Sequence, residues 1–310
     1  PKSYHSKKYL DNYARAKEFI DEQIEMVKLL VEKGFAYQTK QAIYFEVAKI
    51  PDYGKLSGQL LADKEIGARN DVVTDSDKRN PHDFAIWFFA VGHFDGHSMQ
   101  WETPWGSGFP GWHLECSAII HGTLGDPIDI HTGGVDHIGT HHPNEMAQTE
   151  AAFGHPLARY WVHNEFILVD GAKMSKSKGN SFTLKNVIEH GYDQLALRLL
   201  YLQAHYRTEL NFSWENLEAA QNRLKSLYEM ADLKWQLQTD SKDFPYERYI
   251  DNITKALSLD DLDTPQSLSY LSEVVNWTNQ NLVKTSDEDA FNKFLVFLNI
   301  CTKINEKIIV

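Results

Sequence analysis

The chain is poor in cysteine and has no long apolar run. Its two cysteines, Cys116 and Cys301, lie far apart in a sequence of 310 residues, which excludes a disulfide scaffold and favours a reducing compartment. The longest apolar run, AIWFFAV at residues 85–91, is much shorter than the roughly 20 residues that span a bilayer. We therefore expect a cytoplasmic protein without a membrane segment.

Basic residues are outnumbered by acidic ones. The chain has 31 Lys and Arg against 43 Asp and Glu, a formal net charge of −12. This balance argues against non-specific coating of nucleic acid, although an RNA partner needs only a local basic patch. Hydrophobic residues make up 42% and charged residues 24% of the chain, as in ordinary globular proteins. The length predicts two or three domains.

Apolar spacing and turn residues predict an α/β protein with a helical C-terminal third. Residues 6–33 repeat apolar side chains at helical spacing up to Gly34, which predicts one long helix. The other expected elements are strands at 42–47, 128–131 and 160–169, and helices at 144–153, 184–189, 194–204 and 213–237. A strand, a glycine turn and a helix in this order are the pieces of a nucleotide-binding sheet. The helices after Thr183 predict a bundle.

Histidines are concentrated in the middle of the chain, where 11 of the 14 fall between His82 and His163. Within this region Cys116, His141 and Glu145 have the spacing C-x24-H-x3-E. His141 and Glu145 would share one helix face, and thiolate, imidazole and carboxylate are good zinc ligands. Two alternatives stay open: Cys116 is a buried small residue beside a surface helix pair, or His142 replaces His141 as the ligand.

A lysine-rich segment follows the expected turn at Asp170-Gly171. It reads Lys173-Met174-Ser175-Lys176-Ser177, and residues 171–190 contain four lysines but one acidic residue, Glu189. Mobile ammonium groups suit the charge that develops on a triphosphate during nucleotidyl transfer. The alternative is a solvated loop without function, which is the usual fate of a charge run.

Several stretches carry a family resemblance. They are PWGSGFPGWHLECSA (104–118), DIHTGGVDHIGTHHPNEMAQTEAA (129–152), YWVHNEFILVDGAKMSKSKGN (160–180) and HYRTELNFS (205–213), with YGKLSGQ at Tyr53 and NPHDFAIW at Asn80. Together they resemble cysteinyl-tRNA synthetase, a class I aminoacyl-tRNA synthetase. The resemblance runs from Pro1 to about Leu224.

The resemblance implies an α/β fold: the second half of a Rossmann-like nucleotide-binding domain with a connective insertion, followed by an α-helical bundle. The expected regions are the connective region (1–111), the second half of the catalytic domain (112–170), the KMSKS loop and stem-contact region (171–212), and a helical bundle of the tRNA anticodon-binding type (213–310).

The resemblance also implies a zinc ion held by Cys116, His141 and Glu145, with a further cysteine from the family's N-terminal segment. In the family the metal binds the thiol of the substrate cysteine. A thiolate is a much better zinc ligand than a hydroxyl, so serine is rejected without editing. Trp112 resembles the aromatic wall of the cysteine pocket, and His131 and Asp136 resemble residues that meet the substrate amine.

The nucleotide site is implied in the same way. Gly133 and Gly134 would let the backbone approach the adenine or ribose of ATP. The KMSKS segment would bind the phosphates of ATP, chiefly through Lys176 assisted by Lys173, with Met174, Ser175 and Ser177 completing the motif. Mg²⁺ is expected to accompany ATP as part of the substrate.

The implied reaction has two steps. Cysteine and ATP give cysteinyl-adenylate and pyrophosphate, and the 3′-terminal ribose of tRNA(Cys) then accepts the cysteinyl group. The enzyme is expected to be a monomer whose C-terminal bundle recognises tRNA. The family's HIGH motif and first zinc cysteine would precede Pro1, so we expect a fragment that is inactive by itself. His137-Ile138-Gly139-Thr140 imitates HIGH but lies just before the zinc histidine, and we assign it no such role.

Two residues differ from the family pattern, since Phe109 and Phe88 stand where the family has an arginine and a lysine.

Two other functions stay open. A cysteine ligase of mycothiol synthesis would transfer activated cysteine to an amino sugar, although the long helical C-terminal region favours the synthetase. The second alternative is a non-catalytic paralogue that binds tRNA or protein, although the intact KMSKS segment and zinc ligands argue against it.

Overall fold

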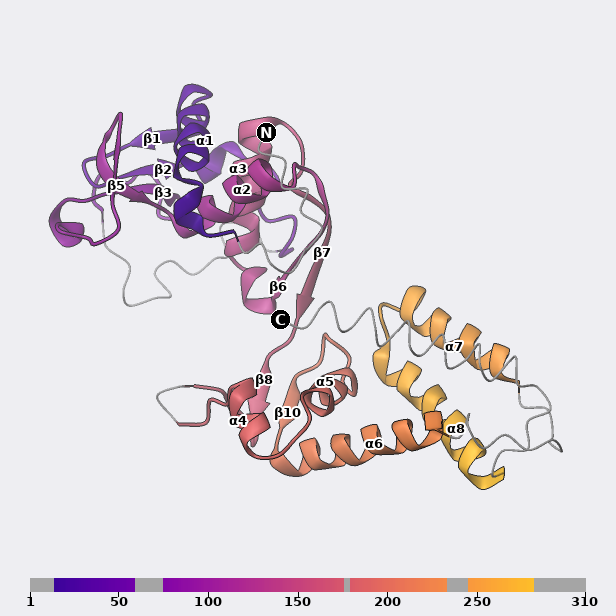
Figure 1. The fold of residues 1–310 in the computed structure, drawn as a ribbon. Helices are drawn as coiled ribbons and strands as arrows, with labels where there is room; N and C mark the ends of the chain where they lie inside the picture. Colours follow the sequence, from indigo (N-terminus) through magenta and orange to yellow (C-terminus); the bar gives the residue numbers. More distant parts are fainter. Residues whose placement is uncertain (1–13, 59–74, 176–178, 233–244, 282–310) are drawn as a thin grey trace. The chain divides into compact units, whose positions relative to one another are not determined.

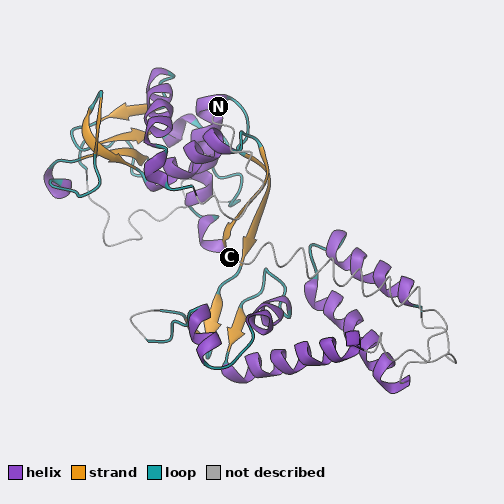
Figure 2. Cartoon of the chain, viewed as in Figure 1, coloured by secondary structure: helices purple, strands orange, loops and turns teal. Residues whose placement is uncertain are grey.

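The computed structural model describes residues 14–58, 75–175, 179–232 and 245–281. The chain forms two compact units, Pro1–His163 and Asn164–Val310 (Figure 1), and both contain helices and strands (Figure 2). Among the helices in the described ranges, none is both long and apolar enough to cross a bilayer. The expected α/β class is therefore confirmed, and the division into four regions remains a prediction.

An antiparallel five-stranded sheet forms part of the first unit. Its strands are β1 (Ala36–Gln38), β2 (Ala42–Phe45), β3 (Phe84–Phe89), β4 (Trp101–Thr103) and β5 (Gly106–Pro110), in the order β1-β2-β3-β5-β4. β2 and β3 fall on aromatic and β-branched runs, which favour a pleated and half-buried surface. Ile43, Phe45 and Trp87 are fully buried. The strand expected at 42–47 is confirmed as far as Phe45, and Val47 instead begins a 3₁₀ turn.

The two residues that differ from the family pattern face each other across this sheet. Phe88 of β3 pairs with Phe109 of β5, and their rings stack with centroids 5.3 Å apart. His97 stacks on Phe109 at 4.1 Å, and Phe94 contacts both phenyl rings. An aromatic cluster therefore occupies the positions where the resemblance predicts an arginine and a lysine.

Three helices contact one another beside the sheet and share the main core with it. They are α1 (Ile20–Glu32), α2 (Trp112–Thr123) and α3 (His141–Phe153). α3 starts three residues earlier than expected, at His141, and ends at Phe153, followed by Gly154, whose φ of 79° is left-handed. Short 3₁₀ turns occur at Ala16–Glu18 (η1), Val47–Lys49 (η2), Gly92–Phe94 (η4) and Val135–His137 (η5).

The single long helix expected over residues 6–33 is wrong at Phe19. This residue separates η1 from α1 and has φ −119° and ψ 27°, outside the helical region. Its side chain is only 2% exposed, so burial of the ring outweighs continuation of the helix. Residues 6–13 lie outside the described part of the chain. Gly34 follows the helix with φ 74°, which confirms the predicted stop.

A two-stranded sheet brackets α3 in the sequence, with β6 (Ile128–Gly134) before it and β7 (Ala158–Asn164) after it. The order of strand and helix is therefore confirmed, but the expected glycine turn is wrong: the strand expected at 128–131 continues through Gly133 and Gly134, and the turn η5 follows it. The continuous strand expected at 160–169 is wrong, because β7 ends at Asn164 and β8 (Ile167–Val169) belongs to the second unit. Between them the Glu165 N–H donates to the Tyr206 carbonyl, 2.8 Å away, so the two strands have different partners.

β8 is the central strand of a small sheet in the second unit, with the order β10-β8-β9. β10 (Leu210–Phe212) runs parallel to β8, and β9 (Ala172–Lys173) runs antiparallel to it. The turn between β8 and β9 consists of Asp170 and Gly171, both with positive φ. This confirms the turn predicted before the KMSKS segment.

The remaining described elements of the second unit are helices. They are α4 (Leu184–Glu189), α5 (Gln194–Leu202), α6 (Trp214–Asp232), α7 (Tyr246–Ser258) and α8 (Thr264–Asn281). Thr183 caps α4 through a reciprocal capping box with Asn186. α7 and α8 share one apolar core with the end of α6, and β8, β10, α4, α5 and the start of α6 share another. The helical C-terminal region is confirmed within the described residues.

We predict that Phe88 and Phe109 stabilise each other through their stacked rings. In a double-mutant cycle of Phe88→Ala and Phe109→Ala, the two losses in the free energy of unfolding should be non-additive by about 1 kcal/mol, the usual value for an aromatic pair. Urea denaturation of the wild type, both single variants and the double variant measures this coupling. Additive losses would show that the rings contribute only independent burial.

Candidate metal centre

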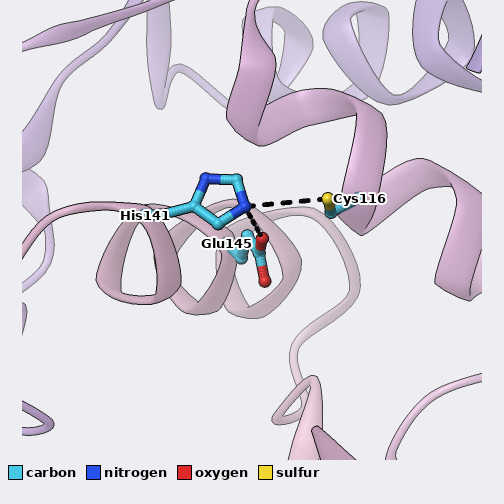
Figure 3. Close-up of side chains that lie close together, drawn as sticks. All are labelled: Cys116, His141 and Glu145. Atoms are coloured by element: carbon cyan, nitrogen blue, oxygen red, sulfur yellow. Dashed lines mark hydrogen bonds and ion pairs between the residues drawn. The ribbon is translucent and has the colours of Figure 1, made fainter. Parts of the chain in front are cut away.

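Three side chains from the first turns of two helices meet inside the first unit (Figure 3). Cys116 projects from α2, and His141 and Glu145 project from the first two turns of α3. Cys116 Sγ lies 3.7 Å from His141 Nε2, which lies 2.6 Å from Glu145 Oε1. The i, i+4 spacing brings the imidazole and the carboxylate to one helix face, and α2 brings the thiol to them.

Glu145 is completely buried, with 0% exposure. Burial alone would raise the pKa of this carboxyl, but contacts with His131 and His141 outweigh it and lower the pKa to about 2. Burial and the neighbouring Glu145 raise the pKa of the Cys116 thiol to about 12. Without a cation, the cluster therefore holds a carboxylate next to a neutral thiol.

A divalent cation fits this donor set. Cys116, His141 and Glu145 each offer one ligand atom, and these atoms all lie within 4.8 Å of one another. Glu145 Oε1 is buried and has no hydrogen-bond partner in the described part of the structure, despite its approach to His141. A shared zinc ion would satisfy this oxygen and favour the thiolate form of Cys116. Three protein ligands also leave a coordination position for another ligand.

Two aromatic residues hold the imidazole of His141 in place. The indole of Trp112 stacks on it with centroids 4.2 Å apart, and Nδ1 of His113 lies 2.7 Å from Nδ1 of His141. When His141 Nδ1–H donates to His113, the lone pair of Nε2 faces Cys116 and Glu145. Such a partner fixes the tautomer of a metal-binding histidine. His113 was not predicted, and its only signal in the sequence is its place in the histidine-rich region.

A second histidine group shares Glu145 from the other side. His131, His142 and Glu145 also place their ligand atoms within 4.8 Å of one another, and His131 Nε2 lies 2.7 Å from Glu145 Oε2. Nδ1 of His142 lies 2.7 Å from Nε2 of His163, and burial lowers the pKa of His142 to about 3. The alternative ligand His142 thus belongs to a group without a thiol, while His141 lies beside Cys116.

The other predicted pocket residues surround this cluster. Trp112 is 49% exposed despite its contact with His141, whereas His131 contacts Glu145. Asp136 lies on η5 beside His137, with 56% of its side chain exposed. A Cβ atom at Gly133 would lie 2.6 Å from an atom of the His142 ring, and one at Gly134 would lie 2.5 Å from Asp136. Packing against the buried ring of His142 is therefore reason enough for Gly133, whereas the half-exposed side chain of Asp136 could move away from a Cβ at Gly134.

The KMSKS segment lies in the second unit. Lys173 ends β9 with its ammonium 5.6 Å from the centre of the Phe166 ring, and Met174 packs against the core beneath the sheet. The side chain of Asn180 accepts from Ser175 N–H at 2.8 Å and donates to the Lys173 carbonyl at 3.2 Å. Sequence reasoning missed this role of Asn180. Lys176 and Ser177 lie outside the described residues.

Comparison with known proteins identifies the family. The family model described as tRNA synthetases class I (C) catalytic domain matches residues 7–222. The chain belongs to this class I tRNA synthetase family. The matched residues include the whole Cys116, His141 and Glu145 cluster and the KMSKS segment, so the resemblance drawn from the sequence is confirmed.

Curated relatives of this synthetase family support the cysteine type. The chain is 40% identical over 282 residues to the cysteine–tRNA ligase of Treponema denticola, covering 84% of this chain and 56% of that protein. It is 42% identical over 274 residues to that of Finegoldia magna, covering 87% and 58%. For the Thermococcus onnurineus ligase the identity is 40% over 309 residues, covering 95% and 63%. The chain thus spans 56–63% of the length of these relatives.

A solved structure shows the same synthetase fold at low sequence identity. It is a Campylobacter jejuni protein provisionally assigned as an arginyl-tRNA synthetase, with a TM-score of 0.55 and 15% identity. The match covers 93% of this chain and 60% of the other. The class I fold predicted from the sequence is therefore confirmed.

We predict that Cys116→Ser in the full-length gene product removes most of the bound zinc, because a neutral hydroxyl is a poor substitute for a thiolate. Metal analysis of the purified protein after dialysis measures the zinc-to-protein ratio. Cys301→Ser is the matched control and should keep the ratio of the wild type. An unchanged ratio in Cys116→Ser would reject Cys116 as a ligand.

The same assay separates the two neighbouring histidines. His141→Asn should lose zinc, whereas His142→Asn should keep it, because only His141 lies beside the thiol. The opposite pattern would assign the metal to the group of His131, His142 and Glu145.

Proposed function

We propose that this chain carries the cysteine-activating and tRNA-charging machinery of a cysteine–tRNA ligase. The observation that carries the proposal is the cluster of the partly buried Cys116 with the buried His141 and Glu145 in a chain whose curated relatives are named cysteine–tRNA ligases. A zinc ion held by the three side chains would bind the thiol of the substrate cysteine and so select it over serine.

The first unit would bind the amino acid. Trp112 leaves half of its indole exposed beside the cluster, and this surface is available to cover the small side chain of cysteine. Asp136 is a half-exposed carboxylate that would attract the substrate ammonium. His131 is held by Glu145, so it would orient the metal-binding carboxylate as well as border the amine.

The second unit would bind ATP through the KMSKS segment. Lys173 and Lys176 supply positive charge for the phosphates, with Mg²⁺ bound to ATP, and Met174 anchors the segment in the core. Asn180 fixes the backbone of Lys173 and Ser175. Adenylate formation needs no covalent enzyme intermediate, so these residues would act by positioning ATP and stabilising charge on the phosphate.

The acceptor would be tRNA(Cys), recognised in part by the helices α6 to α8, and the enzyme would act as a cytoplasmic monomer. An amino-sugar acceptor is disfavoured because the relatives reported above are named tRNA ligases. A non-catalytic role is disfavoured because the thiol, imidazole and carboxylate remain together. Cysteine-dependent exchange between ATP and pyrophosphate in the full-length product, followed by charging of tRNA but not of an amino sugar, tests the proposal. Absence of exchange in the zinc-loaded protein would reject it.

We predict that Lys176→Ala slows adenylate formation by roughly a hundredfold, the usual cost of removing one group that stabilises transition-state charge. Zinc content should stay unchanged, because the lysine belongs to the other unit of the chain. Lys185→Ala is the matched control, since Lys185 is 82% exposed and pairs only loosely with Glu189 at 3.6 Å. An equal rate in both variants would refute the assigned role of Lys176.

A further inference from the structure

The turn between α7 and α8 has an unusual backbone. Asp261 and Leu262 are consecutive non-glycine residues with φ of 53° and 60°. The left-handed region is costly for such residues, above all for leucine, and persists where surrounding contacts determine it. Asp263 stabilises the turn from one side, since its N–H donates to the Ala256 carbonyl and its carboxylate accepts from Gln266 N–H. Asp261 supplies further contacts of this turn.

Asp261 is bound by three consecutive residues of the segment 205–207. Its Oδ1 accepts from the hydroxyl of Tyr206 at 2.7 Å, and its Oδ2 lies 2.9 Å from Nε of Arg207. Nε2 of His205 lies 3.0 Å from the Asp261 carbonyl oxygen. Both carboxylate oxygens and the carbonyl are thus engaged, and the strained conformation is what presents them together.

The segment 205–207 is in turn fixed to the small sheet of the second unit. The Glu165 N–H donates to the Tyr206 carbonyl at 2.8 Å, just before β8. The chain then enters β10, where the side chain of Asn211 accepts from Gly171 N–H at 2.7 Å. Gly171 forms the turn before Lys173. Contacts therefore run from the α7–α8 turn to the strand that carries the first residue of the KMSKS segment.

The contacts between Asp261 and residues 205–207 fix the position of the α7–α8 turn more than they stabilise the fold. The side chains of Arg207 and Asp261 are 65% and 46% exposed, and ion pairs that exposed contribute little to the stability of a fold. α8 is already held to α6 by Arg223, whose Nη2 donates to the Leu268 carbonyl and the Ser272 hydroxyl. These exposed contacts stabilise the fold too little to offset the free energy that two left-handed residues cost. That cost is accounted for if the contacts serve to hold the turn in one position.

We infer that Asp261 is a positioning residue for the macromolecular substrate: it sets α7 and α8 relative to the β8–β10 sheet, so that tRNA bound by these helices is aligned with the strand that leads to Lys173. The inference rests on the proposed function. Asp261 touches neither ATP nor cysteine in this scheme, so its loss should affect tRNA use alone.

Asp261→Gly in the full-length protein is the decisive variant, because glycine removes both carboxylate contacts, with Tyr206 and Arg207, keeps the carbonyl that His205 meets and tolerates positive φ. The KM for tRNA in steady-state charging should rise about tenfold, comparable with a lost pair of coupled contacts, while cysteine-dependent ATP–pyrophosphate exchange stays within about twofold of the wild type. Asp261→Asn keeps one acceptor for Tyr206 and also tolerates this backbone, so it should show a smaller rise.

Asp260→Ala on the same turn is the matched control and should leave the KM for tRNA unchanged. Arg207→Ala should raise this KM as well, and the double variant with Asp261→Gly should add little to either single change. An unchanged KM in Asp261→Gly, or an equal loss of charging and exchange, would overturn the inference and leave the proposed function intact. A wild type without cysteine-dependent exchange would instead reject the proposed function.

Discussion

The buried carboxylate of Glu145 is the constraint on which the candidate centre depends. A carboxylate with no exposed surface must be paired, because removing an unpaired charge from water costs far more than a fold can supply. His131 of β6 contacts one carboxylate oxygen of Glu145, and His141, which lies on α3 with Glu145, approaches the other. α2 then brings Cys116 to the side of Glu145 that is not satisfied by a hydrogen bond. The strand–helix unit and α2 are thereby held around one charge.

The layers around Glu145 explain why this part of the chain is rich in histidine. Neutral imidazoles can be buried at modest cost, and each offers a donor and an acceptor. His113 and His163 back the two neighbouring histidines of α3, and Trp112 and Trp161 cover the rings. A cation would add positive charge beside the buried carboxylate of Glu145. The residues that pack around the cluster would therefore also hold the side chains in place for a cation.

Much of this centre could be predicted from the sequence, because its signals are local. The i, i+4 spacing of His141 and Glu145 needs only a helix, and the lysine-rich segment after Gly171 needs only a turn. The roles of His113 and Asn180 could not be predicted, since they depend on which ring or carbonyl a side chain meets after folding. The predictions of one continuous helix over residues 6–33 and one continuous strand over residues 160–169 were wrong for a related reason. Burial of Phe19 and the hydrogen bond from Glu165 to Tyr206 are tertiary effects that override a periodic pattern.

X-ray absorption at the zinc edge of the full-length protein tests the central claim most directly, because it counts the sulfur atoms bound to the metal. The account predicts a zinc–sulfur distance of about 2.3 Å, one sulfur fewer in Cys116→Ser protein that is reloaded with zinc, and one sulfur more when cysteine is added to the wild type. Serine should leave the sulfur count unchanged. A sulfur count that does not rise with cysteine would contradict the claim that this centre binds the substrate thiol.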